Sequence, residues 1–159
     1  MSDTDRFRLR AATDTDVPAI TQLLKAAFAE QVTLAPPSGA LSETDAKVRE
    51  VMNTAGVLLA EVDRTIAGCV FHATENRALY LFRLAVLPAF RCRGIARALL
   101  DACEEIARTR HLDSTRLSVR LALPRQRAYY ERVGYAAISF GTHPGFTTPT
   151  SVTLEKLQK

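Results

Sequence analysis

The sequence predicts an α/β (α+β) fold with a mixed sheet, and three observations support this prediction. Short apolar runs bounded by turn residues are typical of strands, and longer segments with apolar residues every three or four positions are typical of helices. In chain order these segments read β-α-α-β-β-β-α-β-α-β-β. The length of 159 residues suits one domain with a buried core, so we expect a single domain over residues 1–159.

The first strand and the first helix are predicted from apolar periodicity. Phe7 and Leu9 alternate with arginines, which is the pattern of a half-buried strand. Thr15 or Asp16 is expected to cap the helix that follows, because either side chain can accept from a free N–H group of the first turn. The apolar face of that helix is predicted to consist of Ile20, Leu23, Leu24, Ala27 and Phe28.

A loop, a second helix and a hairpin are predicted next. Residues 31–40 contain two prolines and a glycine, which indicates a loop. Ser42 and Asp45 have the spacing of a helix N-terminus, and the second helix is expected to run to about Met52. The strands of the hairpin are predicted over residues 57–62 and 65–73.

The most strongly patterned stretch is a strand, a short turn and a long helix. Residues 79–87 are mostly large and apolar, as in a strand covered on both faces. Pro88 is expected to end this strand, because proline cannot donate to a sheet ladder. The longest helix is expected to begin at or just after Gly94, where apolar residues repeat along one helical face. These residues are Ile95, Ala98, Leu99, Ala102, Cys103 and Ile106.

The remaining chain is predicted to hold one more helix and three more strands. A helix over residues 125–132 is expected to end at Gly134, which suits the left-handed position after a helix. The strands are predicted over residues 115–121, 135–140 and 151–157.

Composition and charge are those of an ordinary globular protein. Apolar residues make up 47% and charged residues 24% of the chain, and the net charge is +4. We expect a cytoplasmic protein with no membrane partner, because no apolar run approaches a membrane span and the N-terminus lacks a signal-peptide core. The basic excess suits a polyanionic ligand and also a nucleic acid, but the arginines are scattered and no nucleic-acid-binding signature accompanies them.

The three cysteines do not predict a disulfide framework or a metal site. Cys69 falls in a strand pattern and Cys103 on an apolar helix face, so both are expected in the core. Cys92 lies beside arginines at a predicted helix N-terminus, where a thiolate is favoured, and it is either reactive or a bystander. No Cys/His spacing indicates a metal ligand set, so we expect no metal.

The turn between the central strand and the long helix has the chemistry of an anion site. The first N–H groups of a helix have no partner within it and carry the positive end of its dipole. Gly94 allows a ligand close to the backbone, and Arg91, Arg93 and Arg97 add positive charge. An ordinary turn with solvated arginines is the alternative, but the position after a strand and at the start of a helix favours phosphate.

This strand, its following proline and the pattern R-x-x-G-x-A resemble the acetyl-CoA-binding segment of the GNAT superfamily of N-acetyltransferases. The order and lengths of the other elements agree with that family over nearly the whole chain. The resemblance implies a mostly antiparallel sheet flanked by helices and acetyl-CoA (or CoA) as cofactor. It implies a cofactor site formed by Leu84, Ala85, Val86, Arg91, Cys92, Arg93, Gly94, Ile95, Ala96 and Arg97.

A second segment resembles the family's other signature, a helix that carries a tyrosine and ends in glycine followed by an aromatic residue. Here the ending is residues 130–135, with Tyr130, Gly134 and Tyr135. The resemblance implies that Tyr130 protonates the departing CoA thiolate as the catalytic general acid. Packing in the core is the alternative for Tyr130, and it is the expectation for Tyr129.

Two positions depart from the family pattern. Many relatives have a cofactor-binding asparagine where this chain has Leu123, and Arg125 or Gln126 is a possible substitute. Some relatives have a glutamate as general base where this chain has Ser118. The residues that suit a base by type are each also expected as solvated or structural groups; they are Glu30, Glu43, His72 and His143.

The function implied is transfer of an acetyl group from acetyl-CoA to a primary amine by direct attack in a ternary complex, without a cysteine intermediate. A non-catalytic CoA-binding module and a basic nucleic-acid-binding domain are the alternatives. The resemblance places the amine, a small molecule or a peptide, near residues 31–40, Phe82 or Arg83, and residues 143–146. Arg83 is expected to pair either with an acidic substrate or with a carboxylate of its own chain. A homodimer is possible, and no nucleic-acid partner is expected.

Overall fold

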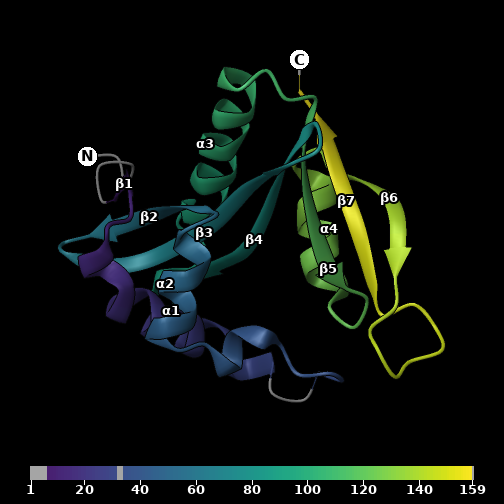
Figure 1. The fold of residues 1–159 in the computed structure, drawn as a ribbon, viewed down its shortest axis with the longest axis horizontal. Coiled ribbons are helices and arrows are strands. Elements are labelled where there is room, and N and C mark those ends of the chain that lie inside the picture. Colours follow the sequence, from purple (N-terminus) through teal and green to yellow (C-terminus); the bar gives the residue numbers. More distant parts are fainter. Residues whose placement is uncertain (1–6, 32–33, 159) are drawn as a thin grey trace. The chain divides into compact units, whose positions relative to one another are not determined.

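The computed structural model describes residues 7–31 and 34–158, and its helices and strands follow the predicted order (Figure 1). The α-helices are α1 (Val17–Phe28), α2 (Asp45–Met52), α3 (Ile95–Thr109) and α4 (Pro124–Arg132). The strands are β1 (Arg8–Ala11), β2 (Gly56–Val62), β3 (Thr65–Glu75), β4 (Ala78–Val86), β5 (Ser114–Arg120), β6 (Ala136–Gly141) and β7 (Ser151–Leu157). Most predicted boundaries are therefore within one or two residues of the observed ones.

The strands form a mixed sheet in the order β1-β2-β3-β4-β5-β7-β6. The pairs β1–β2, β2–β3, β5–β7 and β6–β7 are antiparallel, whereas β4 and β5 are parallel. A parallel pair needs a crossover, and here α3 supplies it. The predicted fold class, a mixed and mostly antiparallel sheet with helices, is confirmed.

The chain divides into two compact units. One unit comprises Met1–Ala73 and Arg83–Ala102, and the other comprises Thr74–Phe82 and Cys103–Lys159. Strands β3 and β4 and helix α3 contribute residues to both. The expectation of a single domain over residues 1–159 stays a prediction.

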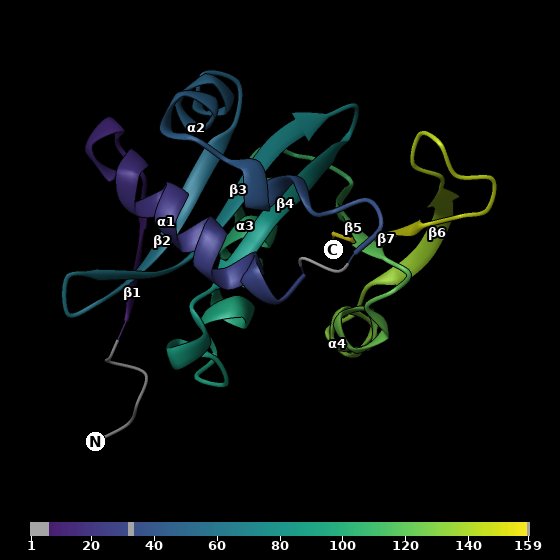
Figure 2. The same cartoon turned by 90° about the horizontal axis from the view of Figure 1, so that it is seen from below.

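In the first unit, α1 and α2 lie beside each other (Figure 2). The predicted apolar face of α1 is buried, apart from the half-buried Phe28. The predicted start of α2 is wrong by two residues, because Thr44 precedes the helix and its Oγ1 accepts from the Lys47 N–H at 3.2 Å. Ser42 instead ends a short 3-10 turn and donates to the Gly39 carbonyl. The described part of the predicted loop over residues 31–40 has no α-helix or strand; residues 32–33 lie outside the described residues.

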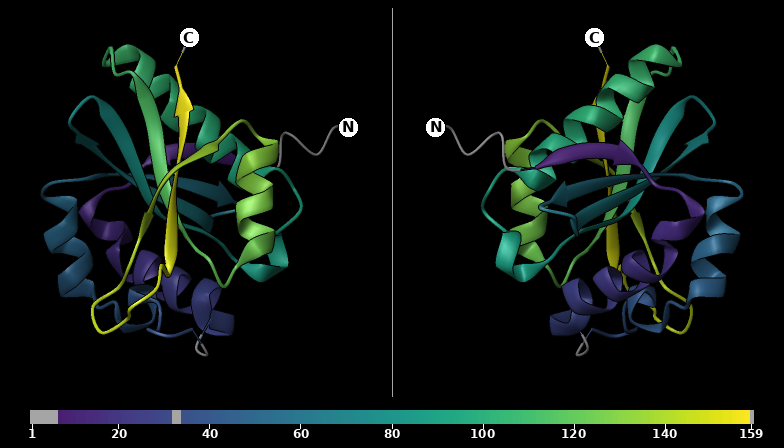
Figure 3. Two further views of the ribbon diagram at one scale, coloured as in Figure 1. Left: turned by 90° about the vertical axis from the view of Figure 1, so that its right-hand side faces the viewer. Right: turned by 90° about the vertical axis from the view of Figure 1, so that its left-hand side faces the viewer.

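In the second unit, β6 and β7 form an antiparallel hairpin joined by residues 142–150 (Figure 3). β5 and β7 pair along their whole length, and Val152 and Leu154 of β7 are fully buried. The Thr115 hydroxyl shares a buried hydrogen bond of 3.0 Å with the Tyr135 hydroxyl. No helix in the described part of the chain is long and apolar enough to span a membrane.

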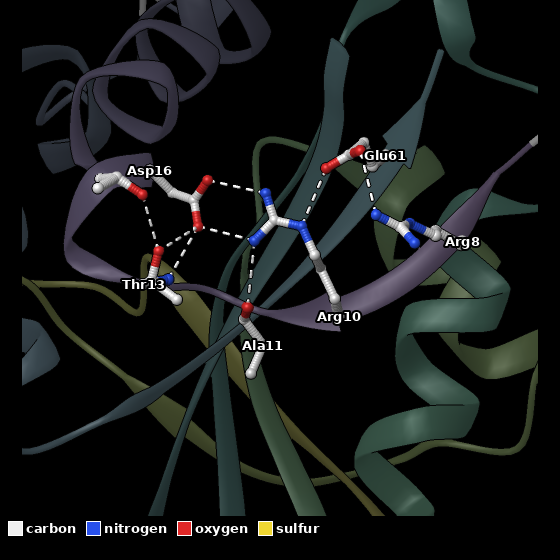
Figure 4. Close-up of polar contacts among 7 residues, drawn as sticks. Arg8, Arg10, Ala11, Thr13, Asp16 and Glu61 are labelled. Carbon is white, nitrogen blue, oxygen red and sulfur yellow. Dashed lines mark hydrogen bonds and ion pairs between the residues drawn. The ribbon is translucent and has the colours of Figure 1, made fainter. Parts of the chain in front are cut away.

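A network of charged groups fastens β1 to the start of α1 and to β2 (Figure 4). The Arg10 guanidinium donates two hydrogen bonds of 2.8 Å to the Asp16 carboxylate and one of 2.9 Å to Glu61. Asp16 also accepts from the Thr13 N–H at 2.8 Å. Of the two caps predicted for α1, Asp16 occupies the N-cap position. Its side chain makes no cap hydrogen bond, because its oxygens bind Arg10 and Thr13.

This network predicts an acid-sensitive contribution to stability. The hydrogen bonds from Arg10 hold the pKa of Asp16 below its usual range. A lowered folded-state pKa stabilises the fold above the unfolded value near 4, and the contribution is lost as the pH falls below it. We expect Asp16→Asn to lower the free energy of unfolding by about 1–3 kcal/mol at pH 7. In urea denaturation the difference from the wild type should shrink below about pH 4; a difference that grows there would contradict the assignment.

Candidate active site

The central strand β4 leaves its neighbour β5 halfway along its length. The parallel ladder between them covers Ala78 to Leu81, paired with Ser114 to Leu117. Two residues later Arg83 has a left-handed backbone, with φ +52°, which non-glycine residues rarely adopt. Beyond it, the described ladder pairs none of residues 84–86 with β5.

On its other side β4 stays attached to β3. The Leu87 N–H donates to the Ala67 carbonyl at 2.8 Å, and the Cys69 thiol donates to the Arg83 carbonyl at 3.5 Å. Burial raises the pKa of Cys69 to about 12, so this group stays a thiol and keeps its proton for that contact. The predicted core positions of Cys69 and Cys103 are confirmed, and Cys92 is exposed.

The Arg83 side chain forms an ion pair within its own unit. Its Nη2 donates to Glu43 Oε1 at 3.0 Å, and the two side chains are 30% and 11% exposed. Of the two partners expected for Arg83, the structure shows the carboxylate of its own chain. The left-handed conformation of Arg83 was not predicted, because nothing about an arginine in an apolar strand indicates it.

The turn before α3 has the backbone geometry of an anion-binding site. Cys92 and Gly94 both have left-handed backbones, with φ +63° and +85°. A Cβ built at Gly94 meets nothing within 4 Å, so the space beside the turn is open. The first helical hydrogen bond runs from the Ala98 N–H to the Gly94 carbonyl, so the preceding N–H groups of the first turn are not used by the helix. The start of α3 at Ile95 is as predicted.

The three arginines of the turn differ in what they contact. The Arg91 guanidinium donates to the Ala27 carbonyl at 3.0 Å, to the Val86 carbonyl at 3.2 Å and to Glu30 at 2.8 Å. Arg93 lies over the ring of Phe90, with 5.3 Å from its Cζ to the ring centroid. Arg97 pairs with Asp101 one turn along α3. Arg91 therefore fastens the turn to α1, and the backbone of the turn offers N–H groups to an anion.

Tyr130 lies on α4, in the second unit, whereas the predicted cofactor residues belong to the first. Its ring packs edge-on against Tyr129 and Tyr135, with centroids 5.6 and 6.0 Å away. Burial is the main cause that raises the pKa of Tyr130 above its usual value, so the hydroxyl keeps its proton at neutral pH. Gly134 takes the predicted left-handed position after the helix, with φ +107°.

The two positions that depart from the family pattern, Ser118 and Leu123, lie in the second unit, on β5 and just before α4. Leu123 is the residue before α4 and makes no side-chain cap hydrogen bond. Ser118 lies on β5, and its hydroxyl donates to the Val152 carbonyl of β7 at 3.5 Å. Arg125 and Gln126 are exposed in the first turn of α4.

Each of the four residues considered as a general base contacts another residue of its own chain. Glu30 binds Arg91, and Glu43 binds Arg83. The buried ring of His72 lies against Gly56. His143 shares a short hydrogen bond with the Thr150 hydroxyl. No group of three His, Cys, Asp or Glu side chains suited to a metal ion was found among the described residues.

Comparison with known proteins assigns the family. A sequence profile described as the acetyltransferase (GNAT) family matches residues 18–135, about three quarters of the chain. The match spans the central strand, the turn, α3 and the segment that ends in Gly134 and Tyr135. The chain belongs to this family, so the protein is an acyltransferase with acetyl-CoA as its cofactor, as the resemblance predicted.

Several solved structures share this fold. The chain resembles the PaiA N-acetyltransferase of Thermoplasma acidophilum in complex with coenzyme A, with 17% identity over 99% of both chains and a TM-score of 0.78. It resembles the ribosomal-protein-S18-alanine N-acetyltransferase of Escherichia coli, with 17% identity over 95% of this chain and 93% of that one and a TM-score of 0.77. A spermidine N-acetyltransferase chimera of Vibrio cholerae SpeG and hSSAT is 20% identical over 96% of both chains, with a TM-score of 0.75. Comparison with curated protein sequences gave no match.

The three contacts of Arg91 predict that lysine cannot replace it. A lysine ammonium lacks the planar fork that lets one guanidinium reach three acceptors. We expect Arg91→Lys to lower the free energy of unfolding by about 1–2 kcal/mol in urea denaturation, because at least one or two hydrogen bonds are lost. Arg93→Lys, which removes an exposed ring contact instead, should cost less than about 1 kcal/mol. Equal effects of the two variants would refute the anchoring role of Arg91.

Proposed function

We propose that the protein transfers an acetyl group from acetyl-CoA to a primary amine by direct attack in a ternary complex. One observation carries this proposal: the turn at the start of α3 has two left-handed residues, open space at Gly94 and first-turn N–H groups left over from the helix. This arrangement fits a diphosphate, which is the charged part of CoA. Membership of the acetyltransferase family supplies the chemistry.

The turn and the open edge of β4 give this coenzyme two attachments in the same unit. We infer that the N–H groups of residues 92–97 hold the diphosphate, while Arg91 keeps the turn in place through α1. The open edge at Leu84, Ala85 and Val86 then pairs with the amide groups of the pantetheine arm, as an added strand would. A backbone N–H in this stretch stabilises the negative charge that develops on the thioester oxygen.

Tyr130 is our proposed general acid. Its raised pKa keeps the hydroxyl neutral, so it can donate to sulfur as the carbon–sulfur bond breaks and the amine bonds to the acetyl carbon. The family signature around Gly134 supports this role, and the matching glutamate of some relatives is replaced by Ser118. We infer that the acceptor ammonium gives its proton to water, since no carboxylate stands at that position, and that the neutral amine then attacks the acetyl carbon.

The acceptor is proposed to be a primary amine on a small molecule or a peptide. Two of the similar structures are acetyltransferases of spermidine and of the alanine of ribosomal protein S18, which are both amine acceptors. The test is thiol release from acetyl-CoA over a panel of polyamines, amino acids and peptides with free N-termini. Amine-dependent release supports the proposal, and binding of CoA without release with any amine would indicate a CoA-binding module instead.

Two substitutions of Gly94 distinguish the effect of a negative charge on CoA binding from the effect of a larger side chain. We expect Gly94→Glu to abolish CoA binding in calorimetric titration, because its carboxylate would face the diphosphate at a distance of a few ångströms. Gly94→Gln has the same size and the same backbone cost, about 1 kcal/mol for a left-handed residue, but no charge. It should weaken binding much less, since the space beside Gly94 is open. Full CoA affinity in folded Gly94→Glu protein would reject the diphosphate site.

Removal of the Tyr130 hydroxyl tests its role as the general acid. We expect Tyr130→Phe to lower kcat by about 100-fold, within the usual range for loss of a general acid, while the Kd for CoA changes little. Because burial raises the pKa of Tyr130, the wild-type kcat should show no loss attributable to this group below about pH 10. The matched control is Tyr129→Phe, which keeps the packing and should retain activity. Unchanged turnover of Tyr130→Phe at saturating substrates would reject the role.

A further inference from the structure

We propose that Glu43 is a positioning residue for the coenzyme: by holding Arg83, it keeps β4 in the conformation that opens the strand edge at residues 84–86. This inference deepens the proposed function and rests on it, because it concerns the same edge of β4. Glu43 lies between a short 3-10 turn and α2, forty residues before Arg83, and it touches none of the proposed cofactor residues in the contacts described.

The left-handed backbone of Arg83 needs support from the rest of its unit. A non-glycine residue in this conformation is strained relative to an extended strand residue. A β4 that stayed extended would avoid this strain and would favour continued pairing with β5 beyond Leu81. Pairing there would use the N–H and carbonyl groups that we assign to the pantetheine arm. The open edge therefore depends on whatever stabilises Arg83 in its observed conformation.

Three contacts from separate elements supply this support. Glu43 Oε1 accepts from Arg83 Nη2 at 3.0 Å, and its side chain is only 11% exposed, so the pair is shielded from most of the solvent. Gly39 lies against the same guanidinium, since a Cβ built there would be 2.9 Å from Nη2. The Cys69 thiol donates to the Arg83 carbonyl, which fixes the backbone from the β3 side. Side chain and main chain of Arg83 are thus both held.

Glu43 and Gly39 both act on the Arg83 guanidinium, but in different ways. Glu43 supplies a charged acceptor, and Gly39 supplies room for the guanidinium to reach it. Removing either one should release the Arg83 side chain and favour the extended backbone. The consequence is a loss of coenzyme affinity at a site that neither residue contacts.

The experiment is calorimetric titration of CoA into the wild type and into Glu43→Gln, Glu43→Ala, Gly39→Ala and Arg83→Met. We expect the Kd to rise about tenfold in Glu43→Ala and in Arg83→Met, and less in Glu43→Gln, which keeps a neutral acceptor. The double variant Glu43→Ala/Arg83→Met should be no weaker than either single variant, because the two act as one unit. Gly39→Ala should shift the Kd in the same direction without changing any charge.

Asp16→Asn is the control, because the Asp16 carboxylate is 12% exposed and paired with an arginine, as that of Glu43 is. The hydrogen bonds and ion pairs described for Asp16 include none to β4. This variant should be less stable than the wild type, but its Kd for CoA should stay within about twofold of the wild-type value. The control thus distinguishes an effect of lower overall stability from a specific effect of Glu43 on CoA binding. In steady-state assays with the best acceptor, Glu43→Ala should raise the KM for acetyl-CoA far more than it lowers kcat.

Several outcomes would overturn the proposal. It fails if the Glu43 and Arg83 variants bind CoA like the wild type, if their effects add in the double variant, or if Asp16→Asn weakens binding equally. A rise in the KM of the amine alone would instead place Glu43 in the acceptor site. Failure of the wild type itself to bind CoA would overturn the proposed function, whereas wild-type binding with unaffected variants would overturn only the positioning role.

Discussion

The rest of the proposed site depends on one constraint, the left-handed turn of the backbone at Arg83. A strand inside a sheet normally satisfies its N–H and carbonyl groups on both sides. β4 does so with β5 only as far as Leu81, and the strained residue follows two positions later. Strain of this kind persists where the surroundings determine it, and it is common at functional sites. Here the surroundings are an ion pair to Glu43 and a thiol contact from Cys69. We therefore propose that packing in the first unit supports the strand edge that we assign to the ligand.

In the turn before α3, the Arg91 side chain makes structural contacts, and we assign anion binding to the backbone N–H groups. The pattern R-x-x-G-x-A suggests that its arginines face an anion, but Arg91 donates to Ala27, Val86 and Glu30 of its own chain. The positive end of the helix and its unused N–H groups remain as the recognition elements. Backbone groups held in place need little reorganisation when a ligand arrives. An arginine that orders this backbone can thus contribute to binding without touching the phosphate.

Sequence reasoning found the features that residue type determines. Apolar periodicity, capping residues and turn residues together predicted the order of the α-helices and strands. Gly94 was recognised because it lets a ligand approach the backbone, and Gly134 because the position after a helix favours glycine. Capping positions were less certain: Ser42 and Thr44 are both good caps, and only the three-dimensional path of the chain selects Thr44. The conformation of Arg83 and its pairing with Glu43 had no local signal, since the two are forty residues apart and arginine gives no indication of a left-handed backbone.

The cysteines bear on whether an acyl-enzyme forms. A thiol acts as a nucleophile only as the thiolate. Burial raises the pKa of Cys69 and of Cys103 to about 12, so both stay protonated at neutral pH, and the proton of Cys69 is used in its contact with Arg83. Cys92 is exposed, but its backbone forms the turn to which we assign the diphosphate, and the reacting thioester lies at the far end of the pantetheine arm. With the three thiols accounted for in this way, the chemistry of this chain agrees with the direct attack that we propose.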